Sequence, residues 1–131
     1  MKRSQANDDA GICQVASFDP KAVTQARRGL PPMGELRETA ERLAVLGNPA
    51  RLALLLALDE RELCVCDSAK VLGGSVSGAS QHLKELRRLG AITFRSAGKM
   101  AYYRIADQRW IDLARSALAL ADRPAPTKAS A

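Results

Sequence analysis

The fold is decided by the stretch Cys64-Val-Cys-Asp-Ser-Ala-Lys-Val-Leu-Gly-Gly-Ser-Val-Ser-Gly-Ala-Ser-Gln-His-Leu-Lys-Glu-Leu-Arg-Arg-Leu-Gly90. Apolar residues at helical spacing predict a short helix over residues 64–72, which the glycine pair at 73 and 74 ends. A second helix opens at Ser75 or Ser77, since either hydroxyl can cap it, and it runs to Gly90. Two helices joined by a turn that contains glycine predict a helix-turn-helix.

The sequence after this stretch has strand character. Residues 91–95 and 100–105 are β-compatible runs, and the Ser-Ala-Gly-Lys segment at 96–99 between them is a hairpin signal. A hairpin beside a helix-turn-helix predicts a wing. A last helix over 107–121 carries an alanine-rich apolar stripe, which suits close helix–helix contact across a dimer.

Three helices are expected before the helix-turn-helix. Asp19-Pro20 and Asn48-Pro49 each place a capping residue before a proline, which opens helices over 21–28 and 51–58, with an amphipathic helix over 33–46 between them. The helix at 51–58 is apolar almost all round and is expected to form the centre of the core. The predicted fold is mainly α with a small β-hairpin: a winged helix-turn-helix domain at 19–121, between a mobile arm at 1–18 and a disordered tail at 122–131.

Charge and composition indicate an anionic partner. The chain has 131 residues, 47% of them hydrophobic, and a net charge of +6, which favours nucleic acid first and an acidic membrane surface second. No apolar run has transmembrane length, and the polar N-terminus does not resemble a signal peptide, so we expect a cytoplasmic protein.

Most of this charge falls on the second helix and the hairpin. Residues 75–104 hold six cations and one anion. Phosphate contacts from cations set affinity for DNA, whereas base edges are read by polar residues of the recognition helix. A solvated cationic face is the alternative interpretation. The predicted DNA-binding residues are the polar Ser77, Ser80, Gln81 and His82 and the cationic Lys84, Arg87, Arg88, Arg95 and Lys99.

Two of the three cysteines, Cys64 and Cys66, form a C-x-C pair at the start of a predicted helix. A helix N-terminus favours the thiolate, which is the form that binds soft metals. Residues two apart do not face each other within a regular helix, so the pair is expected where the helix begins. The alternative is that both are small buried hydrophobic residues. An odd cysteine count favours metal or redox chemistry over a disulfide framework.

Nothing in the sequence predicts an enzyme. His82 is the only histidine, no nucleophile or carboxylate dyad accompanies it, and there is no glycine-rich phosphate loop. Within one helical turn His82 has at most one carboxylate, Glu85, so DNA contact or local hydrogen bonding is expected rather than metal ligation.

Four segments together resemble the ArsR/SmtB family of winged-helix metal-sensing repressors. They are Leu46-Gly-Asn-Pro-Ala-Arg51, Glu62-Leu-Cys-Val-Cys-Asp67, Ser75-Val-Ser-Gly-Ala-Ser-Gln-His-Leu-Lys-Glu-Leu86 and Gly98-Lys-Met-Ala-Tyr-Tyr103. The resemblance covers about residues 33–121 and, because the arm also carries a cysteine, points to the CadC-type cadmium and lead sensors. It implies a homodimer, joined through its terminal helices, that binds a two-fold symmetric operator without metal and releases it when metal binds.

The resemblance also implies a metal site. In the CadC-type site, arm cysteines of one protomer join the C-x-C pair of the other, so Cys13, Cys64 and Cys66 match, whereas Ser17 stands where a second arm cysteine is expected. Asp67 matches a carboxylate ligand of the zinc sensors and is either a weak fourth donor or a helix cap. Three sulfurs with an open side suit Cd(II) or Pb(II), with Zn(II) and As(III) as alternatives.

A second metal site of the family, on the C-terminal helix, is not expected here. Asp107 matches its first member, but that helix contains no histidine. Two other functions stay open for the chain. The thiols could act as a redox switch that closes a disulfide from Cys13 to Cys64 or Cys66, or the protein could be an architectural or metal-buffering DNA binder without regulatory coupling.

Overall fold

The computed structural model describes residues 19–122 of the chain. The predicted arm at 1–18 and all but the first residue of the predicted tail at 122–131 lie outside the described residues. The described chain divides into two units, with the boundary between Arg37 and Glu38. The boundary falls within the helix over 33–46, and the second unit holds the rest of that helix and every later element.

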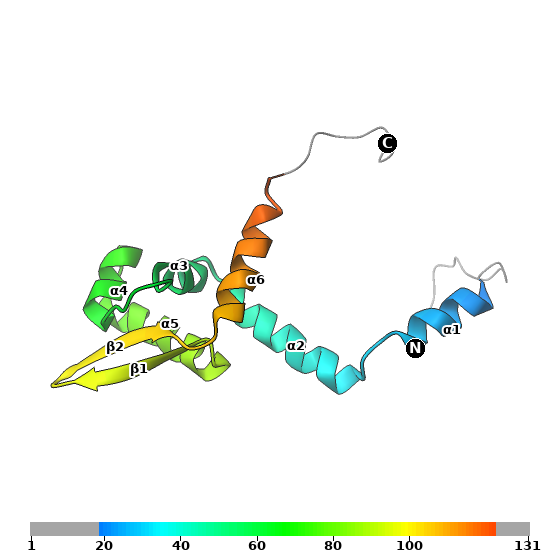
Figure 1. Ribbon diagram of the computed structural model, residues 1–131, viewed down its shortest axis with the longest axis horizontal. Helices are drawn as coiled ribbons and strands as arrows, with labels where there is room; N and C mark the ends of the chain where they lie inside the picture. The colour runs from blue at the N-terminus through cyan, green and yellow to red at the C-terminus, as the bar shows by residue number, and fades with distance from the viewer. Residues whose placement is uncertain (1–18, 123–131) are drawn as a thin grey trace. The chain divides into compact units, whose positions relative to one another are not determined.

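Six helices and two strands follow one another along the described residues (Figure 1). The elements before the helix-turn-helix are α1 (Pro20–Arg28), α2 (Met33–Leu46) and α3 (Pro49–Ala57). The helix-turn-helix is α4 (Val65–Leu72) and α5 (Val76–Leu89), and β1 (Ile92–Ala97), β2 (Met100–Ile105) and α6 (Gln108–Ala119) complete the order. The predicted mainly helical chain with one hairpin is therefore confirmed.

Side-chain caps explain where these helices begin. Asn48 Oδ1 accepts hydrogen bonds from the backbone N–H groups of the second and third residues of α3, at 2.9 and 3.2 Å, and Asp19 caps α1 in the same way. Each cap precedes a proline, whose missing N–H costs nothing at the first helical position. Ser75 Oγ accepts from Gly78 N at 3.0 Å, so Ser75 rather than Ser77 caps α5.

The turn and the wing depend on left-handed glycines. Gly73, after α4, and Gly98, in the hairpin loop, have φ values of +68° and +63°, which residues with a Cβ rarely adopt. Strand β1 pairs antiparallel with β2 from Ile92–Ile105 to Ala97–Met100. The hairpin loop is therefore two residues long rather than the predicted four, because Ser96 and Ala97 continue the strand.

The core of the second unit is built mainly of leucine. Leu54 and Leu55 of α3 are fully buried, as are Leu83 and Leu86 of α5, and α6 adds Ile111. The central role predicted for α3 is confirmed. None of the helices within residues 19–122 combines the length and apolar character needed to cross a lipid bilayer.

Candidate functional site

One face of α5 carries most of the residues that the sequence predicts to contact DNA. Its buried stripe consists of Ala79, Leu83 and Leu86, which pack into the core. The opposite side is exposed and presents Ser77, Ser80, Gln81, Lys84, Arg87 and Arg88. Because α5 is the second helix of the helix-turn-helix, this exposed face is in the position of a recognition surface. Contact of these side chains with DNA stays a prediction.

His82 differs from these residues because it lies on the flank of α5 and is half-buried. Its Nδ1 accepts a hydrogen bond from Arg51 Nε at 3.3 Å, and Arg51 also donates from Nη1 to the Val45 carbonyl at 3.2 Å. A guanidinium can only donate, so Nδ1 carries a lone pair and the neutral ring holds its proton on Nε2. His82 therefore makes a hydrogen bond within the protein, but through a tertiary contact and not the expected local one. No local sequence pattern announces this contact, since the partners are 31 residues apart.

The predicted cations differ in how far their charge is already neutralised. Arg88 pairs with Glu85 at 3.0 Å, and Arg95 of β1 pairs with Glu62 at 2.9 Å. The Arg95 hydrogen bond is the largest cause that lowers the pKa of Glu62, so both groups stay charged. Lys84, Arg87 and Lys99, by contrast, form no ion pair with any residue in the range 19–122. No carboxylate within these residues compensates their positive charge, which leaves it available to a phosphate.

The thiol pair lies at the N-terminus of α4, the first helix of the helix-turn-helix. Cys64 is the N-cap and is 6% exposed, whereas Cys66 is exposed in the first turn. Cys64 Sγ accepts from Asp67 N at 3.5 Å, and Asp67 Oδ2 accepts from Cys64 N at 3.5 Å. This reciprocal pair is a capping box. The helix begins at the C-x-C pair, as predicted. Cys64 and not Asp67 is the N-cap residue, and Asp67, at the third helical position, supplies the second hydrogen bond of the capping box.

The described residues supply only part of a metal site. Within residues 19–122 there is no group of three or more His, Cys, Asp or Glu side chains placed to hold an ion. Cys64 and Cys66 provide two soft donors at a helix N-terminus, which fits a thiophilic metal only if further donors join them. The predicted third ligand, Cys13, and the neighbouring Ser17 lie outside the described residues.

Asp107, at the start of α6, has a structural role. It caps the helix by accepting from Arg109 N at 3.0 Å, and it pairs with the Arg109 guanidinium at 2.7 Å. The side-chain hydrogen bond from Arg109 is the largest cause that lowers the pKa of Asp107.

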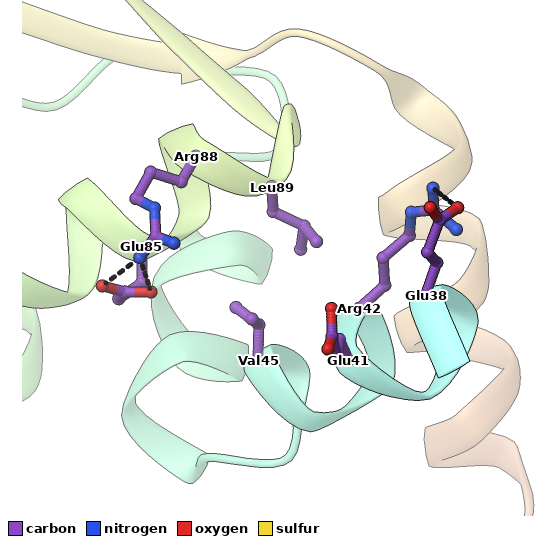
Figure 2. A pocket seen from close by; sticks show the side chains of 7 residues that line it. All are labelled: Glu38, Glu41, Arg42, Val45, Glu85, Arg88 and Leu89. Carbon is purple, nitrogen blue, oxygen red and sulfur yellow. Dashed lines mark hydrogen bonds and ion pairs between the residues drawn. The ribbon is translucent and has the colours of Figure 1, made fainter. Parts of the chain in front are cut away.

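A groove with charged side chains in its lining lies between α2 and α5 (Figure 2). Val45 and Leu89 form its apolar part. Glu38 and Glu85 each pair with an arginine in the rim, and a third carboxylate, Glu41, gives the lining an excess of negative charge. Negative charge repels phosphate, so the lining of this groove is less suited to DNA than the rest of the α5 face, although Arg88 belongs to both.

Comparisons with known proteins agree with this arrangement. Residues 48–93 match the family described as bacterial regulatory protein, arsR family. A transcriptional repressor SmtB homolog from Synechocystis is 31% identical over 88% of this chain and 89% of its own length. A cadmium resistance transcriptional regulatory protein CadC homolog from Staphylococcus aureus is 32% identical over 74% of this chain and 80% of its own.

A solved structure shows the same fold. It is the homodimeric winged helix-turn-helix DNA-binding domain of a possible ArsR-family regulator from Mycobacterium bovis. It matches with a TM-score of 0.60 and 26% identity, over 82% of this chain and 91% of that one. With the helix-turn-helix, the wing and the capped C-x-C pair in place, this chain belongs to the ArsR/SmtB family, whose members are DNA-binding transcriptional regulators rather than enzymes.

Proposed function

We propose that this protein is a metal-responsive transcriptional repressor of the cytoplasm. Its metal-free homodimer binds a palindromic operator and releases it when Cd(II) or Pb(II), or alternatively Zn(II) or As(III), binds a site made by Cys13, Cys64 and Cys66. The observation that carries the proposal is the position of the thiol pair, which begins the first helix of the DNA-binding motif. A ligand of these thiols therefore acts directly on the element that supports the recognition helix.

Binding of DNA is supported by the exposed polar and cationic face of α5 and by the wing. The hairpin projects beyond α4 and α5 in Figure 1 and carries Lys99 in its loop, next to the left-handed Gly98. Cations on a recognition helix and on a wing can contact phosphates on both sides of a groove. The relatives compared above are described as transcriptional regulators or repressors, which agrees with this role.

A homodimer is supported by apolar side chains that the single chain leaves exposed on α2 and α6. Leu43 of α2 is 52% exposed, and Leu113 and Leu118 of α6 are 41% and 57% exposed. Burial of apolar side chains drives association. Two-fold symmetry of the dimer then requires an operator with two half-sites about one helical turn apart. We propose residues 19–121 as this DNA-binding and dimerisation domain, with 1–18 as an arm and 122–131 as a tail.

The metal response is supported by the chemistry of the donors. Thiolates select soft or borderline ions, and a set of three favours Cd(II), Pb(II) or As(III) over a closed tetrahedral zinc site, which normally takes four protein ligands. Cys13 completes the set from the arm. An ion that binds the free dimer more tightly than the DNA-bound dimer must weaken DNA binding by the same factor, typically about 5- to 150-fold.

The test is fluorescence anisotropy of a symmetric operator duplex bound by reduced protein, titrated without oxygen with Cd(II), Pb(II), Zn(II) and arsenite. Thiophilic ions should release the DNA, and Cys13→Ser and Cys66→Ser should each bind DNA but lose the release. Ser17→Ala, which changes the arm without removing a thiol, is the matched control and should respond normally.

Two results would contradict the proposal. Unchanged anisotropy with all four ions excludes a metal sensor. Release by peroxide without metal, reversed by a thiol reductant, would instead identify a redox switch built from the same cysteines.

A further inference from the structure

The segment that leads into the thiol pair is attached to the wing by backbone hydrogen bonds. Leu63 N donates to the Tyr103 carbonyl at 3.1 Å, and Tyr103 N donates to the Leu63 carbonyl at 2.8 Å. Leu63 thereby pairs with β2 as an additional one-residue strand. Because Leu63 directly precedes Cys64, the residue that caps α4 cannot move far without also moving β2.

A side-chain ion pair connects the same segment to the other strand of the wing. The Arg95 Nε lies 3.0 and 3.1 Å from the two carboxylate oxygens of Glu62, and its Nη2 lies 2.9 Å from Oε1. Arg95 stands on β1 opposite Tyr102, and its guanidinium lies 5.0 Å from the centre of the Tyr102 ring. The segment that contains Glu62 and Leu63 is therefore attached to both strands.

The wing is in turn attached to the recognition helix. The rings of Phe94 on β1 and Tyr103 on β2 are 5.5 Å apart between centroids. The guanidinium of Arg87, near the C-terminus of α5, lies over the Phe94 ring at 4.4 Å. Direct contacts thus run without a break from Cys64, through Leu63 and Tyr103, to Phe94 and Arg87.

We propose that Glu62 and Arg95 are positioning residues through which metal ligation at the thiol pair displaces the wing and thereby lowers its affinity for DNA. This inference deepens the proposed function and rests on it. Cys64 is buried and its sulfur accepts the Asp67 N–H, so it must turn outward to share an ion with the exposed Cys66. The loss of that hydrogen bond opens the capping box and loosens the first turn of α4, and the attachments of Glu62 and Leu63 carry the resulting displacement of the backbone into the hairpin.

The proposal gives Arg95 a different role from the other predicted cations. A residue that neutralises a phosphate contributes about 0.9 to the slope of log affinity against log salt concentration. Since Glu62 already compensates Arg95, Arg95→Gln should leave this slope unchanged. Lys99→Gln, at an uncompensated cation on the same hairpin, should lower it by about 0.9. A smaller slope for Arg95→Gln would mean that Arg95 contacts phosphate, which would overturn its positioning role.

The main experiment measures the coupling factor, which is the ratio of operator dissociation constants with and without saturating Cd(II). Glu62→Gln should reduce this factor about 1.4- to 5-fold, the range that corresponds to one exposed ion pair. Glu85→Gln is the matched control, because it also removes one negative charge and one arginine ion pair, but that pair joins Glu85 to Arg88 within α5 and not to the wing. It should leave the coupling factor unchanged even where it alters affinity.

Exchanging the charges of Glu62 and Arg95 tests whether the coupling depends on their ion pair or only on the net charge. Glu62→Arg and Arg95→Glu should each reduce the coupling factor, and the double variant, which restores both the pair and the net charge, should recover it. Wild-type coupling in Glu62→Gln, or no recovery in the double variant, would overturn the inference.

A second measurement without DNA separates the inference from the proposed function. The thiolate-to-metal charge-transfer absorption band reports Cd(II) binding. NMR chemical shifts follow the backbone amides of Gly98 and Lys99 at the tip of the wing. These amides should shift on binding in the wild type and shift less in Glu62→Gln. Bound Cd(II) that releases DNA without moving them would overturn the inference alone. Failure of Cd(II), Pb(II), Zn(II) and arsenite alike to release DNA would overturn the proposed function and the inference together.

Discussion

Replacement of Cys64 should distinguish its role as a helix cap from its role as a ligand. In the metal-free protein its sulfur accepts the Asp67 N–H at 3.5 Å and is almost fully buried. Alanine removes this acceptor, and loss of an N-cap side chain costs about 0.5–2 kcal/mol. Alanine also removes a buried atom about the size of a methylene, which adds about 0.8 kcal/mol. We therefore expect Cys64→Ala to lower the free energy of unfolding by about 1–3 kcal/mol.

Serine should behave differently, because it is among the preferred N-cap residues. Its hydroxyl oxygen can accept the same Asp67 N–H, and this offsets the burial of a more polar group, so Cys64→Ser should stay within about 1 kcal/mol of the wild type. At the exposed Cys66, serine should change stability by no more than about 0.5 kcal/mol.

The assay is urea unfolding followed by circular dichroism, with chelator and reductant present. The protein concentration must be the same for every variant, because the stability of a dimer depends on concentration. Equal destabilisation by Cys64→Ser and Cys64→Ala would refute the capping argument. If the expected order holds, any loss of metal response in the serine variants reports the chemistry of the ligand and not the loss of a fold.

Three further outcomes follow from contacts described above. Ser75→Ala should destabilise the protein by about 1 kcal/mol in urea unfolding, whereas Ser77→Ala should have a clearly smaller effect, and equal effects would contradict Ser75 as the cap. His82 is the only histidine, so the ¹⁵N signals of its ring need no assignment. In the neutral ring the proton should be on Nε2, because Nδ1 accepts the hydrogen bond from Arg51. Arg51→Lys should raise the fraction of the tautomer that is protonated on Nδ1. The hydrogen bond from Arg115 of α6 is the largest cause that lowers the pKa of Asp59 in the folded protein. Asp59 therefore stabilises the fold above the ordinary pKa of an aspartate, about 3.9, and this stabilisation is lost as the pH falls through the lower pKa of the folded state. The stability difference between wild type and Asp59→Asn should therefore disappear in strong acid, and a difference that persists there would contradict the ion pair.

Local signals in the sequence were enough to predict the helices. Asp19 and Asn48 cap α1 and α3 as predicted, and each helix begins at the following proline, because capping and the proline ring act within one turn. The choice between Ser75 and Ser77 needed the structure, since both hydroxyls are near the start of α5 and bond to each other at 3.3 Å. The hairpin loop was predicted too long because strand pairing, rather than local propensity, carries β1 through Ala97.

The contacts that matter most for the site could not be predicted in this way. Arg51 and His82 are 31 residues apart, and Glu62 and Arg95 are 33 apart, so no periodic pattern relates them. Arg95 was predicted from the charge of its segment alone, and that charge says nothing of a carboxylate brought to it by the tertiary fold. The thiol pair, by contrast, was predicted correctly at the helix start, because its spacing and position are local properties.

The cap made by Cys64 has a consequence for how sensitive such a sensor can be. In the proposed site the same sulfur serves two competing purposes, since it cannot keep its hydrogen bond to the Asp67 N–H unaltered while it also bonds an ion. The concentration of metal at which the protein responds therefore depends on how firmly the first turn of α4 is held, and not only on which ligands surround the ion. Evolution could raise or lower the detection threshold by changing residues within this helix that never touch the metal, leaving every cysteine in place.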